Sequence, residues 1–426
     1  MREDVAGGVC DFALTDWKKL RLSDLAQYHN GVAFKPADWV EDGLPIIRIE
    51  QLNNPDGEFD RYAGLVAENN RIRNGDLIFS WSATLKAIIW RHGDAVLNQH
   101  LFKVVPKPNI DIHFLHFVLD FNMEALGNSS HGSTMKHIKP SELDKFFVAA
   151  PSTVRQRKIA AILSTIDTAI EQTEALVEKY QRIKAGLMHD LFTRGVLPNG
   201  QLRPPREQAP ELYQETSIGW IPREWQAIRL GNILVRIDAG WSPECQETPP
   251  GIGERGVLKV SAVTRGVYDS SESKVLPRKL RPDPSIEVAD GDVVLTRANG
   301  VAALVGVTVQ VKNTPSQLML SDKLLRLVPL ESVMTKSFLT FVMQTSFIKT
   351  QIDGVMSGSS GQRNIAQSQI RNFVCGCPPR KEQLLVETRL QAIELALEKE
   401  TLRQQKLGVQ KLGLMQDLLT GKVSVQ

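Results

Sequence analysis

The stretch RQRKIAAILSTIDTAIEQTEALVEKYQRIKAGLMHDLFTR, residues 155–194, carries apolar side chains at alternating steps of four and three residues. That spacing repeats every seven residues and predicts a long helix that packs along one face against another helix. The same pattern returns 227 residues later, where LMQDLLTGKV (414–423) aligns with LMHDLFTRGV (187–196). We therefore expect two long helices of the same design in one chain, at 153–194 and 380–421.

A contact face for the two helices follows from this spacing, and we refer to it as the helix seam. Its apolar residues are Ile159, Leu163, Ile166, Ile170, Val177, Tyr180, Leu187 and Leu191 in the first helix and Val386, Leu390, Ile393, Leu397, Leu407, Leu414 and Leu418 in the second. Lys184 and Lys411 occupy equivalent seam positions where an apolar residue is otherwise expected. If the helices pair antiparallel, they form a coiled coil with pseudo-two-fold symmetry, in which each helix is ~60 Å long. In the alternative arrangement, each helix packs on its own globule.

The duplication continues into the segments that precede the helices, where short motifs occur twice in the same order. The matching pairs are 17–22 with 225–230, 46–49 with 257–260, 74–80 with 290–296, 97–106 with 320–329, 114–118 with 338–342 and 127–134 with 354–361. Turn residues followed by β-rich apolar runs predict strands in both copies. The offset between the copies grows from 208 to 227 residues, so the second copy is about 19 residues longer.

The predicted fold class is α+β, a tandem duplication of a β-rich α/β globule in which a long helix follows each copy. The predicted boundaries are 1–152 for the first globule, 153–194 for its helix, 195–215 for a linker, 216–379 for the second globule and 380–421 for its helix. Proline, glycine and polar residues between 195 and 224 indicate a boundary between the copies or a loop over the surface.

Composition restricts the compartment and the function. The 426-residue chain has a formal net charge of +3 and no apolar run long enough to span a membrane. Its N-terminus contains acidic residues and lacks the apolar segment of a signal peptide. The four cysteines do not have the paired spacing of a zinc site. These features predict a cytoplasmic protein, and the nearly neutral charge gives no general electrostatic support for nucleic-acid binding.

Motifs for catalysis and cofactors are missing from the sequence. The glycine fingerprint Gly251 to Gly256 follows two prolines and precedes a strand-like run at 256–263, an order that predicts a loop rather than a dinucleotide site. A P-loop and the Asn-Pro-Pro-aromatic motif of amino-methyltransferases are absent. Seven of the eight histidines lie in the first globule without the acidic or cysteine pattern of a metal site. We expect no catalytic residue, metal or cofactor in this chain.

Polar residues at corresponding places of the two copies are the candidates for binding. They lie in Gly/Ser loops and at strand ends, and the two copies hold different side chains there. The candidate DNA-binding residues are Trp81, Lys86, Asn98, Gln99, His100, Ser133, Thr134, Lys136, His137, Arg297, Asn299, Ser321, Lys323, Ser359, Ser360, Gln362, Arg363 and Asn364. Such side chains contact phosphates or base edges, so the pattern fits two readers of different sequences. The alternative interpretation is two mobile surface loops of ordinary polar composition.

The charge balance of the globules limits a simple electrostatic account of binding. Residues 14–152 carry 15 Lys/Arg against 17 Asp/Glu, and residues 216–379 carry 18 against 14. DNA binding would therefore need local charge clusters, or a partner that supplies phosphate contacts.

Two motifs resemble one known family. The helix motif QRKIAAILSTIDTAIE (156–171) and the segment SIGWIPREWQAIRLG (217–231) are similar to the specificity (S) subunit of type I restriction–modification systems. The resemblance extends from Trp17 to Val423 with the parts in the same order. The first globule lacks the SIGWIP segment, which leaves the first sixteen residues unassigned.

This resemblance implies a non-catalytic subunit that recognises DNA. Each globule would be a target-recognition domain for one half of a bipartite, asymmetric target, and the helix pair would set the spacer. Two methyltransferase (M) subunits, which hold S-adenosylmethionine, would dock on the helices and the neighbouring globule surface. Restriction (R) subunits, which use ATP and magnesium, would complete the complex. Two other readings remain open: a coiled-coil scaffold whose globules bind protein, and an enzyme that acts on nucleic acid directly.

Overall fold

The computed structural model describes residues 17–55, 57–82, 84–129, 140–358 and 361–425. It divides into two compact units. The first unit comprises Met1–Leu176 and Glu400–Gln426, and the second comprises Val177–Lys399. Each unit thus contains one globule together with half of each long helix. No helix in the described part of the chain is both long enough and apolar enough to cross a membrane.

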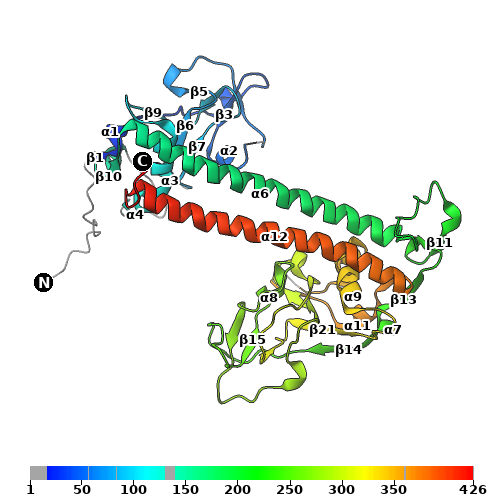
Figure 1. The fold of residues 1–426 in the computed structure, drawn as a ribbon. Helices are drawn as coiled ribbons and strands as arrows, with labels where there is room; N and C mark the ends of the chain where they lie inside the picture. The colour runs from blue at the N-terminus through cyan, green and yellow to red at the C-terminus, as the bar shows by residue number, and fades with distance from the viewer. Residues whose placement is uncertain (1–16, 56, 83, 130–139, 359–360, 426) are drawn as a thin grey trace. The chain divides into compact units, whose positions relative to one another are not determined.

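The two long helices are α6 (Thr153–Thr193) and α12 (Arg380–Leu419), and Figure 1 shows each as an unbroken ribbon. Within the first unit, Asp167 pairs with Lys411 at 2.9 Å and Glu174 with Gln404 at 3.0 Å. Residue numbers rise along α6 as they fall along α12, so the helices pair antiparallel in this unit.

The seam residues occupy the contact face of these helices. None of the fifteen apolar seam residues is exposed; each is buried or half-buried. Ile159 and Leu163 of α6 lie in the core of the first globule, and Leu418 of α12 lies in the same core. The helices therefore pack both on each other and on a globule, which combines the two arrangements that the sequence left open.

A seam lysine forms an ion pair with the other helix in each unit. Lys411 Nζ lies 2.9 Å from Asp167 in the first unit. In the second unit Lys184 Nζ lies 2.8 Å from Glu394, the residue 227 positions after Asp167. The duplication therefore includes the polar partner of each off-pattern lysine as well as the lysine itself.

The first globule is built from two four-stranded sheets. Its strands are β1 (Lys18–Arg21), β2 (Ala26–Asn30), β3 (Leu44–Ile47), β4 (Arg61–Tyr62), β5 (Arg71–Ile72), β6 (Leu77–Ser80), β7 (Lys86–Ile89), β8 (Ala95–Leu97), β9 (Leu101–Pro106) and β10 (Phe147–Ala150). One sheet has the order β2-β9-β6-β7 and the other β4-β3-β8-β5, while β1 pairs with β10. The helical segments are α1 (Leu22–Leu25), η1 (Pro36–Asp38), α2 (Ile49–Asn53), η2 (Glu68–Asn70), α3 (Ile112–Phe121), α4 (Met123–Ser129) and α5 (Pro140–Leu143).

The second globule repeats this plan. Its strands are β11 (Tyr213–Thr216), β12 (Gly219–Pro222), β13 (Gln226–Arg229), β14 (Leu234–Ala239), β15 (Gly256–Leu258), β16 (Ser273–Val275), β17 (Val293–Thr296), β18 (Ala298–Asn299), β19 (Thr308–Gln310), β20 (Leu318–Met319), β21 (Leu324–Pro329), β22 (Arg363–Asn364) and β23 (Val374–Cys377). The order β14-β21-β17-β19 matches β2-β9-β6-β7 strand for strand, and β13 pairs with β23 as β1 does with β10. The other sheet has three strands, β16-β15-β20, where the first globule has four. The structure thus confirms the tandem α+β duplication.

Helical segments connect these strands. They are α7 (Leu230–Ile233), α8 (Ser261–Thr264), η4 (Pro284–Ile286), η5 (Ala302–Leu304), α9 (Lys336–Met343), α10 (Ser346–Val355) and α11 (Gln367–Asn372). The run 256–263, expected as a continuous strand, instead divides into β15 and the single turn of α8. The strand-like expectation was wrong for its second half, because apolar periodicity does not separate a short strand from a buried helical turn.

The linker between the copies has secondary structure of its own. After η3 (Pro210–Leu212), β11 and β12 form a hairpin with its turn at 217–218, and Gly219, the first residue of β12, has a φ of +87°. The predicted boundary at 215/216 falls inside this hairpin. Buried Arg203 anchors the segment, because its guanidinium contacts Glu382 of α12 at 2.5 Å and Glu224 at 3.2 Å. The linker is therefore fastened to α12 rather than lying free on the surface.

Two glutamines at the start of the long helices fasten each helix to its globule. Gln156 accepts a hydrogen bond from the backbone N–H of Asp111 at 2.9 Å and donates to the carbonyl of Pro151 at 2.9 Å. Gln383 makes the equivalent bonds to Thr335 at 3.3 Å and Pro378 at 3.0 Å. Both side chains are buried, so each amide replaces the water that these backbone groups would otherwise need.

His116 of α3 lies at the junction of the first globule with both long helices. Its Nε2 is 3.1 Å from the carbonyl of Ala87. Burial lowers the pKa of His116 from 6.5, opposed by the charge of Asp120, while Lys411 lowers it further and Asp167 raises it.

Because folding depresses this pKa, the neutral imidazole contributes stability above about pH 6.5 that is lost as the pH falls. We expect the free energy of unfolding to decline between about pH 7 and pH 5, by at most ~1.4 kcal/mol per pH unit from this proton. Calorimetric melting of the full chain and of the His116→Gln variant across that pH range measures this decline in the free energy of unfolding. The variant should show the shallower decline, and equal slopes would contradict the assignment.

Candidate nucleic-acid interface

Corresponding strand ends in the two globules carry different side chains. In the first globule β6 and β9 pair up to Ser80 and Leu101, and Trp81 and His100 follow at this end. The Trp81 and His100 rings lie 5.8 Å apart, and Ser82 Oγ is 3.4 Å from His100 Nδ1. These contacts place an indole and an imidazole together at the end of the sheet.

The equivalent end of the sheet β14-β21-β17-β19 in the second globule carries two cations. Strands β17 and β21 pair up to Thr296 and Leu324, and Arg297 and Lys323 follow. The Arg297 N–H donates to the carbonyl of Lys323 at 2.8 Å. Arg297 is half-buried and Lys323 is exposed. One backbone frame therefore presents Trp and His in one globule, and Arg and Lys in the other.

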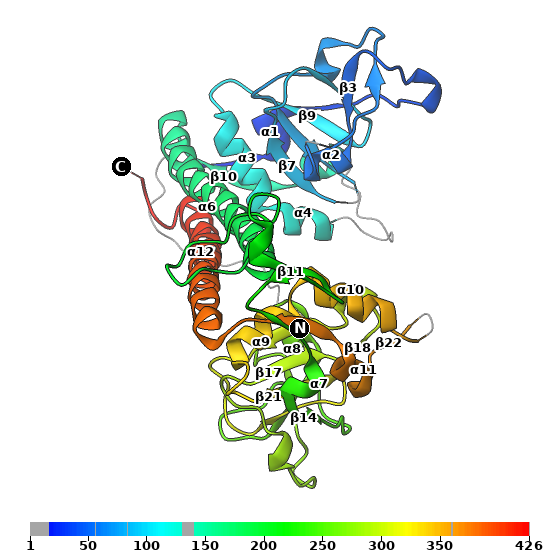
Figure 2. The ribbon, with the colours of Figure 1, turned by 90° about the vertical axis from the view of Figure 1, so that its right-hand side faces the viewer.

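A short antiparallel pair adds further polar residues beside these cations. Strands β18 and β22 pair Asn299 with Arg363, and Figure 2 shows the two strands together beside α10 and α11. The Ile365 N–H donates to the carbonyl of Arg297 at 3.1 Å, which joins this pair to the strand end. Arg363 and Gln362 are exposed. We call Arg297, Lys323, Gln362 and Arg363 the second strand-end cluster.

Several candidates hold the backbone rather than facing outward. In the first globule Asn98 is 7% exposed, and its Oδ1 accepts from the N–H of His100 at 3.3 Å. Lys86 Nζ donates to the carbonyl of Leu52 at 2.6 Å and to Asn53 Oδ1 at 3.3 Å, so it caps the end of α2. Gln99 is exposed. Trp81 is half-buried and packs against the core of this globule beside Phe102, and His100 is half-buried as well, so Gln99 is the most exposed of these candidates.

The second globule shows the same division. Asn299 Oδ1 accepts from the N–H of Val301 at 2.9 Å, and Asn364 exchanges backbone hydrogen bonds with Ser357. Ser321 is 4% exposed and lies beneath the surface. Six further candidates lie outside the described residues: Ser133, Thr134, Lys136, His137, Ser359 and Ser360.

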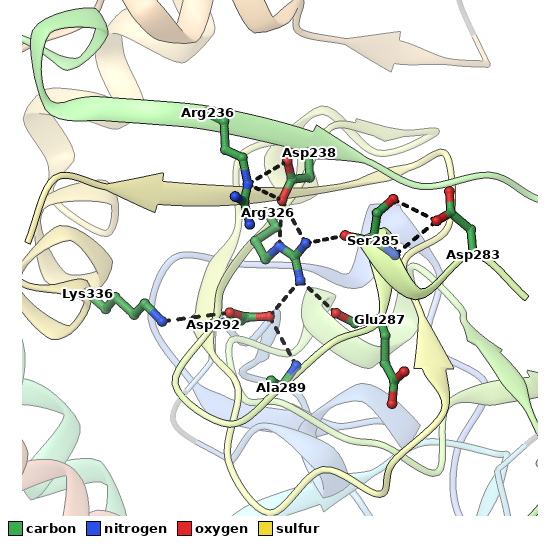
Figure 3. A network of polar contacts seen from close by, with 9 residues as sticks. All are labelled: Arg236, Asp238, Asp283, Ser285, Glu287, Ala289, Asp292, Arg326 and Lys336. Atoms are coloured by element: carbon green, nitrogen blue, oxygen red, sulfur yellow. Dashed lines mark hydrogen bonds and ion pairs between the residues drawn. The ribbon is translucent and has the colours of Figure 1, made fainter.

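A buried cation network centres on β21 of the same sheet, and the candidate residues of the sequence did not include it. Arg326 of β21 is 6% exposed. Figure 3 shows its guanidinium between Asp238 at 2.8 Å and Asp292 at 3.0 Å, with the carbonyls of Ser285 and Glu287 each at 2.6 Å. Burial alone would lower the pKa of Arg326, but these carboxylates raise it above its usual value. The group therefore stays charged inside the globule.

The first globule has a simpler network at the equivalent place. Lys103 of β9 is 8% exposed and lies 2.9 Å from Asp76 and 2.7 Å from the carbonyl of Arg71. Asp76 follows the Gly75 turn just as Asp292 follows Gly291, and both glycines have positive φ. The sequence did contain a signal for this network. In both copies an acidic residue directly follows the glycine turn, and the strand that pairs with the next strand carries a cation.

The described residues offer no metal centre, because no three His, Cys, Asp or Glu side chains among them come together as ligands. What the strand ends provide is hydrogen-bond donors and ring faces on rigid sheet termini. Arginine and lysine at such positions donate to guanine edges or phosphates, and rings such as tryptophan and histidine stack or contact bases.

Known proteins share this architecture. Residues 15–179 match the family described as type I restriction modification DNA specificity domain. The chain is 24% identical over 426 residues to the type I restriction enzyme MjaVIII specificity subunit of Methanocaldococcus jannaschii, covering 96% of this chain and 94% of that protein. It is 24% identical over 401 residues to the EcoKI specificity subunit of Escherichia coli, covering 88% and 82%. The crystal structure of a type I S subunit from M. genitalium has the same fold, with a TM-score of 0.59 at 13% identity over 95% of this chain and 96% of that chain. Over most of its length the chain is therefore similar to specificity subunits of type I restriction–modification systems, and its first part matches their DNA specificity domain.

Proposed function

We propose that the protein is the non-catalytic DNA-recognition subunit of a type I restriction–modification complex, and that each globule reads one half of a bipartite, asymmetric target. The observation that most supports this is the pair of equivalent strand ends. Trp81 and His100 in one globule correspond to Arg297 and Lys323 in the other, on sheets of the same strand order. Different side chains on one frame are what two readers of different half-sites require.

The proposal gives the helix pair two further roles. The helices set the number of unread base pairs between the half-sites, and they dock two methyltransferase subunits. Docking is supported in the first unit by apolar side chains on the outer face of α12, where Leu402, Val409 and Leu412 are 49%, 71% and 67% exposed. Large exposed apolar residues clustered on one face are typical of protein interfaces. S-adenosylmethionine would be held by those subunits, and ATP and magnesium by restriction subunits.

A map of methylated adenines tests the proposal. DNA is sequenced from cells that express this chain together with its methyltransferase partner, and from cells that express the partner alone. We expect a split motif that disappears when this chain is omitted. Methylation that is independent of the chain, or a continuous motif, would contradict the proposal and favour a scaffold that binds protein.

Arg297→Ala should relax the preference at one base pair of one half-site. A well-placed arginine contributes ~1–3 kcal/mol of discrimination to a guanine contact, so the occupancy of non-cognate bases at that position should rise at least several-fold. The other half-site should stay unchanged. Trp81→Ala is the matched control, because its effect should be confined to the opposite half. Equal loss in both halves from either variant would show that these residues serve folding or general affinity.

A further inference from the structure

Two loops meet at one end of the second globule, beside β15 and β16. Loop 248–255 precedes β15, and loop 276–282 follows β16. The Val275 N–H donates to the carbonyl of Thr248 at 2.9 Å, and the Leu276 N–H to the carbonyl of Arg255 at 2.7 Å. These bonds hold the loops together, and we call the pair the two-loop tip.

The two-loop tip is basic and ends in an exposed apolar side chain. Arg278 is 96% exposed, with only a 3.9 Å contact to Glu254, and Lys279 and Arg281 are exposed as well. Ile252 is 108% exposed and sits between two glycines, one of which has a φ of +77°.

The corresponding place in the first globule has the opposite charge. Loop 36–43 precedes β3 and loop 63–68 follows β4, in the same antiparallel arrangement. Leu65 is 101% exposed there, much as Ile252 is in the second globule. These loops contain Asp38, Glu41, Asp42 and Glu68 and no lysine or arginine. The exposed apolar residue is thus common to both tips, and the cations are confined to one.

We propose that the two-loop tip binds the DNA backbone beside the half-site read by the second globule. Arg278, Lys279 and Arg281 would contact phosphates, and Ile252 would pack against the groove edge. Lysine and arginine contacts to phosphates position a protein on the duplex without reading sequence, and isoleucine is one of the apolar residues that proteins insert against base steps. The proposal rests on the proposed function. It implies that the second globule contributes more than the first to the affinity for DNA.

Salt dependence separates the two parts of this contact. For the test, the chain is assembled with its methyltransferase subunits and mixed with a duplex that carries the target from the methylation map. The affinity of the complex for this duplex is measured by fluorescence anisotropy over a range of salt concentrations. Each lost phosphate contact lowers the slope of log affinity against log salt by ~0.9. The triple variant R278A/K279A/R281A should therefore lower the slope by about 2 to 3. Ile252→Ala should weaken binding about fivefold without changing the slope.

The first globule supplies the matched control. Leu65→Ala removes an equally exposed apolar side chain from the acidic tip, and its affinity and slope should equal those of the wild type. Thermal melting verifies that each variant is folded. An unchanged slope in the triple variant, with the split motif still methylated, would overturn the tip contact alone. If the wild-type complex shows no target-dependent binding, the proposed function fails, and the tip contact fails with it.

Discussion

Replacing Arg326 by methionine is expected to lower the free energy of unfolding of the chain by about 3–5 kcal/mol. The change leaves Asp238 and Asp292 inside the second globule without the cation that lies 2.8 Å and 3.0 Å from them. It also removes the donors to two backbone carbonyls of 285–287. A buried carboxylate that loses its partner must either stay charged in a poor dielectric or take up a proton, and both are costly.

Urea denaturation followed by tryptophan fluorescence measures this loss. Arg236→Met is the control, because Arg236 contacts the same Asp238 at 3.1 Å but its side chain is 61% exposed. A screened surface pair of this kind should cost no more than ~1 kcal/mol. Adding Asp238→Asn and Asp292→Asn to Arg326→Met should recover part of the stability. A loss below that of the control would show that the network is not buried as described.

Adding one heptad to each long helix is expected to lengthen the unread spacer by about three base pairs and leave both half-sites unchanged. Seven residues extend a helix by ~10 Å, and one base pair of B-DNA rises ~3.4 Å. The insertion points are Ala175/Leu176 in α6 and Leu402/Arg403 in α12. Because Glu174 pairs with Gln404, these points face each other, and the ion pairs Asp167–Lys411 and Lys184–Glu394 keep their partners.

The methylation map reads the outcome directly. Insertion into α6 alone is the control, and it should abolish methylation, because the seam on one side of the insert then loses its register. If the complex with both insertions still methylates targets with the original spacer, the helices do not set the spacer length. A double insertion that changes the half-sites themselves would show that the helices take part in base recognition.

The parts of the fold that rest on periodicity or on repeated turns were predictable from the sequence. The helices follow from their seam residues, since a heptad pattern has few other solutions. The matched strands follow from turns such as those at Gly75 and Gly291, which need positive φ in both copies. Short elements without a period were not predictable, and α8 is the example, because one helical turn carries too few residues to show its spacing.

The candidate interface was predictable only as a set of positions. Sequence placed Trp81, His100, Arg297 and Lys323 at corresponding strand ends, and the structure brings each pair together. It could not say that Lys86 turns toward the end of α2, because side-chain direction depends on a carbonyl 34 residues away. Nor could it find Arg326, whose partners come from three separate segments of the chain.

The division of the chain into units has a consequence for synthesis on the ribosome. The second unit is one continuous segment, 177–399, so all of its residues are available once position 399 has been made. The core of the first globule, in contrast, includes Met415, Leu418 and Leu419 from the last turns of α12. Chains emerge N-terminus first and their domains generally fold as units. The globule that is translated first is therefore the last to be completed.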